Sequence, residues 1–193
     1  MIKDFTEIYY AKADKIDVEK SLKFLPKIRL EKVQKLKDEN AKRLSVAAYL
    51  LLKKVLRKHF IKIDRYEFNY LDNGKPVLIN SPIQFSLSHS GNYVAVAISD
   101  SSVGVDIQEM REIDLDSRRF VFSEEDEKFF QESEDKIDAF YSLWTIKEAV
   151  YKFDGTPFKE VTIKDAASIT VENNYKLAFI SLSGNYKIKK VRI

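Results

Sequence analysis

Two side chains that carry oxygen stand two residues apart in a short apolar segment, where they could hold a cation. The segment Gly104-Val105-Asp106-Ile107-Gln108 is apolar apart from its carboxylate and its amide. Because side chains alternate along a strand, Asp106 and Gln108 share one face. Carboxylate and carbonyl oxygens are the usual ligands of hard cations. The structural alternative is an aspartate that ends a strand and caps the segment after it.

A second carboxylate lies in a predicted helix over 140–152. Trp144, Glu148 and Lys152 recur at four-residue spacing and therefore share one side of that helix. A glutamate one turn before a lysine can be a surface ion pair, but the only tryptophan of the chain, one turn earlier, favours a partly enclosed carboxylate. The stripe expected to be buried consists of Leu143, Ile146, Ala149 and Val150.

His89 and Lys75 each allow a structural and a functional interpretation. His89 stands between Ser88 and Ser90 at the end of an alternating segment, where an imidazole and a hydroxyl could bind phosphate or simply complete a strand. Lys75 follows Asn73-Gly74, a hairpin signal, so it belongs to a turn and could also contact phosphate.

The composition excludes several kinds of chemistry. There is no cysteine and there are two histidines, which rules out thiolate catalysis, disulfides and a three-histidine zinc site. A catalytic metal would therefore be held by oxygen, which favours magnesium, manganese or calcium. The first residues are charged and the longest apolar run, 46–52, has seven residues, so we expect a cytoplasmic protein without a membrane segment.

The elements expected to position these residues come in two similar series. Residues 18–60 read as mainly helical, with a break and helix start at Asp38-Glu39-Asn40. Helices are predicted again from Ser123, a good N-cap, and from Asp138 to about Phe153. After a strand-like start at 7–10, the predicted strands are 67–70, 85–89, 93–98, 103–107, 168–171, 175–182 and 186–193. The order is thus helices followed by strands, twice.

Charge is unevenly distributed although the net charge is only +3. Residues 12–65 contain 17 Lys and Arg against 7 Asp and Glu, a local charge of +10, whereas residues 100–140 contain 5 against 14, a local charge of −9. The basic segment could face an anionic partner, nucleic acid included, or could be an ordinary solvated surface.

The order of the motifs along the chain is more specific than any single motif. The chain contains Asn-Gly-Lys-Pro, Phe-Ser-Leu-Ser-His-Ser-Gly, Gly-Val-Asp-Ile, Phe-Ser-Glu-Glu-Asp and Trp-Thr-Ile-Lys-Glu-Ala-Val-Tyr-Lys in that order within 73–152. This succession resembles the Sfp-type 4′-phosphopantetheinyl transferases, and the last motif resembles their Trp-x-x-Lys-Glu-Ala subgroup. Ala41-Lys42-Arg43 at a helix start also resembles the family.

The resemblance implies an α+β fold of two pseudo-symmetric halves, 1–101 and 102–193, each a helix-covered, mainly antiparallel sheet, with the active-site cleft between them. It implies a monomeric enzyme that transfers 4′-phosphopantetheine from coenzyme A to a serine of an acyl or peptidyl carrier protein, with Mg²⁺, releasing adenosine 3′,5′-bisphosphate. The alternatives are a module of the same fold that binds coenzyme A or carrier protein without turnover, and a nucleic-acid binder that uses residues 12–65. The resemblance itself implies neither nucleic acid nor membrane as a partner.

The resemblance also implies roles for single residues. Asp106, Glu148 and Gln108 would hold the metal, Glu148 would in addition accept the serine proton, and Lys152 would neutralise pyrophosphate charge, so Glu148, Lys152 and Asp106 are the expected catalytic residues. The residues expected to bind coenzyme A, besides Lys152, are Arg43, Lys75, Ser88 and His89.

Some assignments stay open at this stage. The family commonly has an acidic residue where Gln108 stands, so we expect weaker metal binding or a water at that position. Four further cations, Lys27, Arg29, Lys32 and Lys35, could each reach a phosphate, and the role of Lys147 is undefined.

Overall fold

The described part of the chain forms a mixed α+β structure. The computed structural model describes residues 5–72 and 74–193, and of residues 116–118 it describes the backbone only. The predicted turn at Asn73 and the first four residues lie outside the described parts. The α-helices are α1 (Val18–Leu22), α2 (Lys27–Gln34), α3 (Glu39–Lys58), α4 (Glu124–Glu132) and α5 (Lys136–Asp154). The 3-10 turns are η1 (Ile63–Arg65), η2 (Asp116–Val121) and η3 (Phe158–Glu160).

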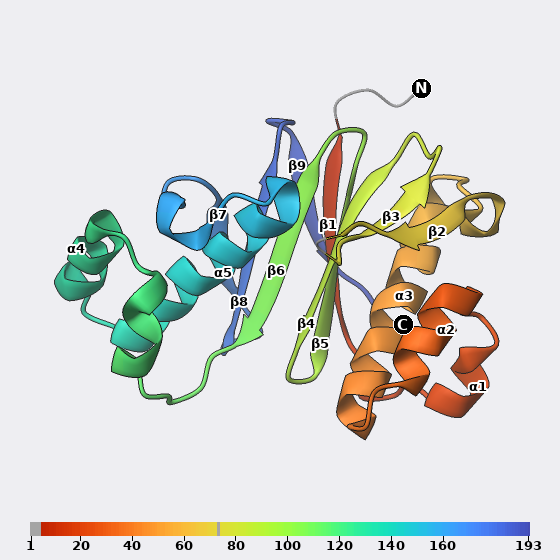
Figure 1. Cartoon of the computed structure of the whole chain (residues 1–193), viewed down its shortest axis with the longest axis horizontal. Coiled ribbons are helices and arrows are strands. Elements are labelled where there is room, and N and C mark those ends of the chain that lie inside the picture. The colour runs from red at the N-terminus through yellow and green to blue at the C-terminus, as the bar shows by residue number, and fades with distance from the viewer. Residues whose placement is uncertain (1–4, 73) are drawn as a thin grey trace.

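The described strands form three sheets, of which the two larger ones meet at the centre of the molecule and the β2-β3 hairpin lies to one side, near α3 (Figure 1). The first has the order β4-β5-β1-β9, the second is the β2-β3 hairpin, and the third has the order β6-β8-β7. All neighbours are antiparallel except β1 and β9, which are parallel. The strand bounds are β1 (Thr6–Lys12), β2 (Glu67–Tyr70), β3 (Pro76–Ile79), β4 (Gln84–Ser90), β5 (Tyr93–Ser99), β6 (Val103–Glu109), β7 (Ala167–Val171), β8 (Tyr175–Ser181) and β9 (Tyr186–Lys190).

Helices cover the outer sides of the central sheets. In Figure 1, α1, α2 and α3 lie on one side, and α4 and α5 lie on the other. The buried face of α3 includes Leu44, Ala47, Leu51 and Val55, which recur at the spacing of one helix face and pack against β4 and β5. The first residues of α3 are held by Asp38, whose carboxylate accepts a hydrogen bond from the backbone of Ala41, as its N-cap position predicts.

Three serines join the two larger sheets. The strands β4 and β6 belong to different sheets, yet they are linked through side chains on alternate residues of β4. The hydroxyls of Ser86, Ser88 and Ser90 accept hydrogen bonds from the backbone amides of Val105, Ile107 and Glu109, at 3.1, 3.2 and 3.0 Å. The serine hydroxyls accept the hydrogen bonds that backbone carbonyls would accept in a sheet. They thereby fix the position of β4 along β6, which places Ser88 beside Asp106.

The helix α5 lies unusually close to β6. A Cβ atom added to Gly104 would come within 3.0 Å of both the carbonyl carbon of Ala149 and the Cβ of Phe153, and nearer still to the Ala149 oxygen. Carbon atoms pack comfortably at about 3.5–4.0 Å, so only glycine permits this approach. The consequence is that the α5 segment around Glu148 sits directly over the β6 segment that carries Asp106.

The ends of α5 and the middle of the N-terminal region differ from the sequence-based expectation. The helix begins at Lys136, two residues before the predicted start, because the carboxylate of Asp135 caps the backbone amide of Asp138. It ends at Asp154 and is capped by Gly155, whose φ of +87° suits glycine. The helical stretch over 18–60 is broken into three helices, with Pro26 at the N-cap of α2. The short strand β3 was not predicted.

The last strand crosses back to the first sheet. β9 pairs in parallel with β1, and the amide of Val191 donates to the carbonyl of Tyr10 just after β9 ends. The predicted strand over 186–193 is therefore shorter, ending at Lys190. Within the described residues, no helix is both long enough and apolar enough to cross a lipid bilayer.

Candidate active site

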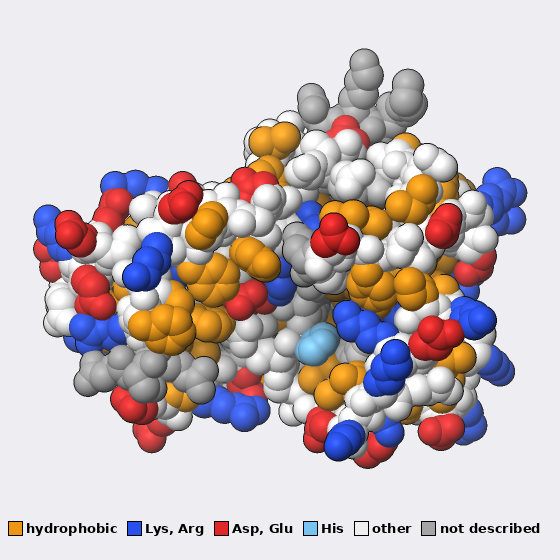
Figure 2. Space-filling view, in the orientation of Figure 1, with side chains coloured by type: hydrophobic (Ala, Val, Ile, Leu, Met, Phe, Trp, Pro, Cys, Tyr) orange, Lys and Arg blue, Asp and Glu red, His pale blue; other side chains and the backbone are white. Residues whose placement is uncertain are grey.

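The candidate site is a pocket of about 310 Å³ between the α3 side and the α5 side of the molecule. Figure 2 shows that this face is hollowed between the two sides, with a histidine and several lysine and arginine side chains around the hollow. The predicted site residues that line the pocket are Ser88, His89, Asp106, Gln108, Glu148 and Lys152. Six residues from β4, β6 and α5, separated by up to 64 positions, are thus brought together.

Asp106 is the centre of the hydrogen-bond network. Its side chain is 1% exposed. One carboxylate oxygen accepts hydrogen bonds from the Ser88 hydroxyl at 2.6 Å and the Lys152 ammonium at 2.5 Å, and the other accepts from the Gln108 amide nitrogen at 3.0 Å. Lys152 also donates to the Ser88 oxygen at 3.1 Å. A buried carboxylate held by a cation and two neutral donors is fixed in position.

Glu148 is the second carboxylate of the pocket. It is half-buried one helical turn before Lys152, and among the described residues it makes no hydrogen bond or ion pair. Burial raises the pKa of Glu148, and the negative charge of Asp106 raises it further, while Lys152 opposes the shift. Two carboxylates near one another, one of them without a partner, form a place where a cation or a proton is favoured.

His89 stands at the exposed end of β4. Partial removal of its ring from water lowers the pKa of His89, and the positive charges of Lys152 and Arg29 lower it further. Asp106 opposes this shift. The ring is therefore uncharged at neutral pH, and it can take part in hydrogen bonds to a ligand without adding a second fixed charge beside Lys152.

An arginine that sequence reasoning left among four candidates lines the same pocket. Arg29 is 6% exposed, and its terminal nitrogens donate to the Tyr70 hydroxyl at 3.0 Å and the Ser45 carbonyl at 2.7 Å. Its Nε atom is buried without a hydrogen-bond partner among the described residues, and none of their carboxylates forms an ion pair with it. Burial lowers the pKa of Arg29. A buried guanidinium that lacks a protein anion can bind an anionic ligand.

Lys32 is the second cation of this wall. Its ammonium lies over the Tyr70 ring, 4.2 Å from the ring centroid, and it lines the pocket together with Arg29. Burial and the charge of Arg29 lower the pKa of Lys32. The other two candidates, Lys27 and Lys35, are not part of the pocket lining. Only three-dimensional packing makes this selection, because all four cations belong to one charged stretch of sequence.

Lys75 and Arg43 lie beside the pocket and not in its lining. Lys75 stands between two lining residues, Gly74 and Pro76, but its ammonium is directed at the carbonyls of Val103 and Phe153, at 3.4 and 3.3 Å. Arg43 lines a separate hollow of about 480 Å³ next to the β4-β5 turn. In that hollow its guanidinium donates to the side-chain oxygens of Asn40 and Asn92, at 2.6 and 3.0 Å.

The donor set suits a hard cation. Asp106 and Glu148 supply two carboxylates and Gln108 supplies an amide oxygen, and Mg²⁺ in proteins commonly uses one or two carboxylates and completes its six oxygens with water and phosphate. The described residues contain no cluster of three or more histidine, cysteine or acidic side chains that suits a metal, in keeping with an amide at position 108. The residues therefore fit magnesium and do not fit zinc.

Comparison with known proteins supports the resemblance seen in the motifs. Residues 102–189 match the family model of the 4′-phosphopantetheinyl transferase superfamily. These residues contain β6, α4 and α5, and therefore Asp106, Gln108, Glu148 and Lys152. The resemblance to Sfp-type relatives is confirmed, whereas the Trp-x-x-Lys-Glu-Ala subgroup stays a prediction.

Several known proteins are similar to the chain over part of its length. "4'-phosphopantetheinyl transferase psf-1" of Bacillus pumilus is 37% identical over 114 residues, which are 54% of this chain and 49% of that protein. "4'-phosphopantetheinyl transferase Sfp" of Bacillus subtilis is 28% identical over 144 residues, 71% of this chain and 64% of that protein. "4'-phosphopantetheinyl transferase AcpT" of Salmonella typhimurium is 37% identical over 95 residues, 46% of this chain and 50% of that protein. The matches thus span about half to two thirds of the length of these relatives.

Proposed function

We propose that this chain transfers the 4′-phosphopantetheine moiety of coenzyme A to a serine hydroxyl of an acyl or peptidyl carrier protein. The observation that carries the proposal is one pocket in which Asp106, held by Ser88 and Lys152, faces the unpartnered carboxylate of Glu148. This pocket supports phosphoryl-type chemistry, since such reactions depend on positioning and on stabilisation of charge. The family match over the same residues is the independent support.

The reaction is a displacement at phosphorus. The serine oxygen forms a bond to the β-phosphoryl group of coenzyme A, the bond to the bridging oxygen of the pyrophosphate breaks, and adenosine 3′,5′-bisphosphate leaves. Glu148 accepts the proton of the serine hydroxyl. Burial and Asp106 raise the pKa of Glu148, which makes it a stronger base than an exposed glutamate. Lys152 is placed to neutralise charge on the pyrophosphate.

Magnesium would be held by Asp106 and Glu148, with the Gln108 amide as an uncharged third donor. When bound it would neutralise charge on the phosphate oxygens. The amide contributes no charge, so we expect weaker metal binding than with an acidic residue at position 108. In the structure both oxygens of Asp106 already accept hydrogen bonds, from Lys152 and Gln108 among others. The Gln108 nitrogen now faces Asp106, so the amide would have to turn to offer its oxygen to the metal.

The nucleotide part of coenzyme A is expected on the wall formed by Arg29 and Lys32. A buried guanidinium without a protein anion supports binding of a phosphate there, because the phosphate would complete its ion pairing. The neutral ring of His89, between this wall and Lys152, can contribute a hydrogen bond. Arg43 and Lys75 remain proposed contacts at the edge of the coenzyme site.

The arrangement of the proposed enzyme follows from the same resemblance. We infer two related halves, 1–101 and 102–193, that act as one monomeric unit with the cleft between them. The serine links between β4 and β6 support a cleft at that junction, since they join strands from the two halves. The basic stretch over 12–65 supports attraction of an acidic carrier protein.

The proposal is tested by the mass of the acceptor. A panel of apo carrier proteins is incubated with coenzyme A, Mg²⁺ and the native chain, and each is weighed by mass spectrometry. Addition of phosphopantetheine to at least one carrier is the expected result. Binding of coenzyme A without any mass increase would favour the alternative, a non-catalytic binding module of the same fold.

A further inference from the structure

Lys147 directly precedes the proposed base Glu148 on α5, but it points about 100° away from it around the helix, into the buried side. Its side chain is 0% exposed. The ammonium contacts the Asp126 carboxylate at 2.6 Å, the Phe158 carbonyl at 2.7 Å and the Val161 carbonyl at 2.5 Å. An ammonium has three N–H groups, and each finds one acceptor here. Lys147 therefore joins α5 to the start of α4 and to the segment around η3.

The Asp126 partner is itself firmly placed. Its carboxylate accepts a hydrogen bond from the backbone of Ser123, while the Ser123 hydroxyl accepts one from the backbone of Asp126, the reciprocal arrangement of a capping box. Asp126 is 0% exposed, so the ion pair with Lys147 is buried on both sides. Removal of one partner from such a buried pair would leave an uncompensated charge, so the pair ties α5 to α4.

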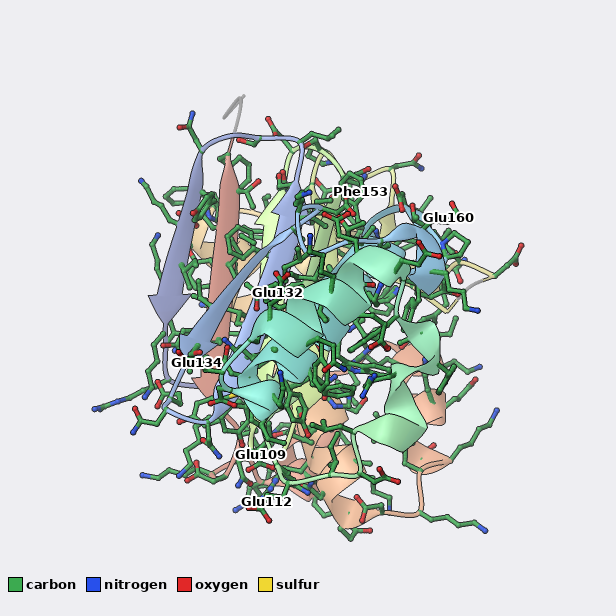
Figure 3. The ribbon with its side chains drawn as sticks, turned by 90° about the vertical axis from the view of Figure 1, so that its left-hand side faces the viewer. Glu109, Glu112, Glu132, Glu134, Phe153 and Glu160 are labelled. Atoms are coloured by element: carbon green, nitrogen blue, oxygen red, sulfur yellow. The ribbon has the colours of Figure 1, made fainter. Side chains whose placement is uncertain are left out.

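The backbone held by Lys147 carries an aromatic ring that packs against two residues of α5, one on either side of Glu148 in the sequence. The Phe158 ring meets Trp144 edge-on, with ring centroids 5.8 Å apart, and meets Tyr151 in the same way at 5.9 Å. Trp144 stands one turn before Glu148 on α5, and Tyr151 about one turn after it. We call Trp144, Tyr151 and Phe158 the aromatic ledge. In Figure 3 the segment that carries Glu160, next to Phe158, lies beside the C-terminal half of α5.

The ledge is open to solvent but lies outside the coenzyme pocket. Tyr151 is 39% exposed, and Trp144 and Phe158 are half-buried. None of the three lines the pocket that contains Glu148. A molecule that rests on the ledge therefore contacts α5 within about one turn of Glu148 and leaves the coenzyme pocket open.

We propose that Lys147 is a positioning residue that holds the aromatic ledge in place through the carbonyls of Phe158 and Val161, and that the acceptor protein rests on this ledge when its serine reaches Glu148. The second half of the proposal depends on the proposed function, whereas the first half does not. Partly exposed aromatic rings beside a reactive group are typical anchors for a protein partner. Lys147 acts at a distance, since its ammonium faces away from the reacting groups.

The only tryptophan of the chain reports on the ledge directly. In Lys147→Met the ammonium is lost while most of the stem remains, so the Phe158 segment is released and Trp144 loses its edge-on partner. We expect red-shifted Trp144 emission and stronger quenching by acrylamide. We also expect the KM for the carrier protein to rise about ten-fold, the size typical of one lost interface anchor, with the KM for coenzyme A unchanged.

A matched control is available on the same helix and sheet. Lys176 is 6% exposed and pairs at 2.7 Å with Asp138 in the first turn of α5, far along the helix from Glu148. Lys176→Met also removes a buried ammonium and should lower stability, but it should leave the Trp144 emission and the KM for the carrier unchanged. Phe158→Ala is a second test that keeps the ion pair between Lys147 and Asp126, and it should reproduce both the emission change and the KM change.

The outcomes separate the two halves of the proposal. Unchanged Trp144 emission in folded Lys147→Met would overturn the positioning role, and if that variant does not fold, unchanged carrier KM in Phe158→Ala would overturn the ledge. A rise in the KM for coenzyme A equal to that for the carrier would also contradict a role limited to the acceptor. Failure of the proposed function looks different, since the native chain would then modify no carrier protein at all.

Discussion

Replacing Gly104 by alanine is expected to separate the two carboxylates of the site. The new methyl group would lie 3.0 Å from the Ala149 carbonyl carbon and 3.0 Å from the Phe153 Cβ, and nearer still to the Ala149 oxygen. Relief to the ordinary carbon spacing of about 3.5–4.0 Å requires α5 and β6 to part by roughly 1 Å. The carbonyl belongs to the helix backbone and cannot rotate away as a side chain would.

The expected loss of turnover follows from the residues that α5 and β6 carry. Glu148 immediately precedes Ala149, and Asp106 is two residues after Gly104, so the displacement acts almost directly on the distance between the carboxylates. A misplacement of about 1 Å commonly lowers turnover by about 10²-fold. Overpacking of this kind also costs about 1–3 kcal/mol of stability. The loss of turnover should therefore be much larger than the loss of folded protein.

The assay compares initial rates of carrier modification with thermal unfolding for each variant. Gly184→Ala is the matched control, because no atom lies within 4 Å of a Cβ added there and its backbone is not in the left-handed region. This control should keep both the native rate and the native melting temperature. A native rate in Gly104→Ala would refute the idea that close approach of α5 to β6 sets the spacing between Asp106 and Glu148.

Three further predictions concern single side chains of the pocket. Folding raises the pKa of Glu148, so the charged form of this residue opposes folding at pH values above the raised pKa, and this cost in stability disappears at acid pH. In metal-free protein, Glu148→Gln should therefore raise the melting temperature near pH 8 and leave it unchanged near pH 4. Equal shifts in melting temperature at the two pH values would contradict burial as the cause. Arg29→Met should raise the KM for coenzyme A about 10- to 100-fold, since a hydrogen-bonded charge is lost. Arg43→Ala, measured in the same assay, tests whether the hollow lined by Arg43 belongs to the coenzyme site. An unchanged KM for coenzyme A in Arg43→Ala would remove Arg43 from that site. Gln108→Glu should lower the Mg²⁺ concentration needed for half-maximal rate, and an unchanged concentration would show that position 108 does not contribute to metal binding.

Much of α5 was predictable from spacing alone. Trp144, Glu148 and Lys152 recur every four residues, and in the structure Trp144 and Glu148 are the half-buried residues within an otherwise buried stretch. The stripe Leu143, Ile146 and Ala149 is buried as expected. Helical periodicity and capping residues are both signals that are local in sequence. For that reason the buried face of α5 and the N-cap Ser123 of α4 could both be predicted.

Other features depend on contacts between distant segments. The parallel pairing of β9 with β1 joins residues about 180 positions apart, and nothing local specifies it. The functions of Gly104 and of the Ser86, Ser88 and Ser90 hydroxyls arise from a helix and a strand that pass close by. A glycine in a strand indicated an unusual backbone, but only the structure shows which helix requires it.

The choice among the four candidate cations also depends on contacts between distant segments. Arg29 and Lys32 belong to a stretch rich in lysine and arginine, and charge alone does not distinguish them from Lys27 or Lys35. Burial of Arg29 without a carboxylate partner distinguishes it, and that property exists only once α2 packs beside α3. Lys147 is a similar case, because its acceptors come from α4 and from the segment after α5.

The central claim is that Glu148 and Asp106 form the reactive centre of a phosphopantetheinyl transfer. The most direct measurement is the mass of an apo carrier protein after incubation with coenzyme A, Mg²⁺ and either the native chain or Glu148→Ala. We expect addition of one phosphopantetheine by the native chain and none by the variant, with coenzyme A still bound by both. Equal modification by the two proteins, or no modification of any carrier by the native chain, would contradict it.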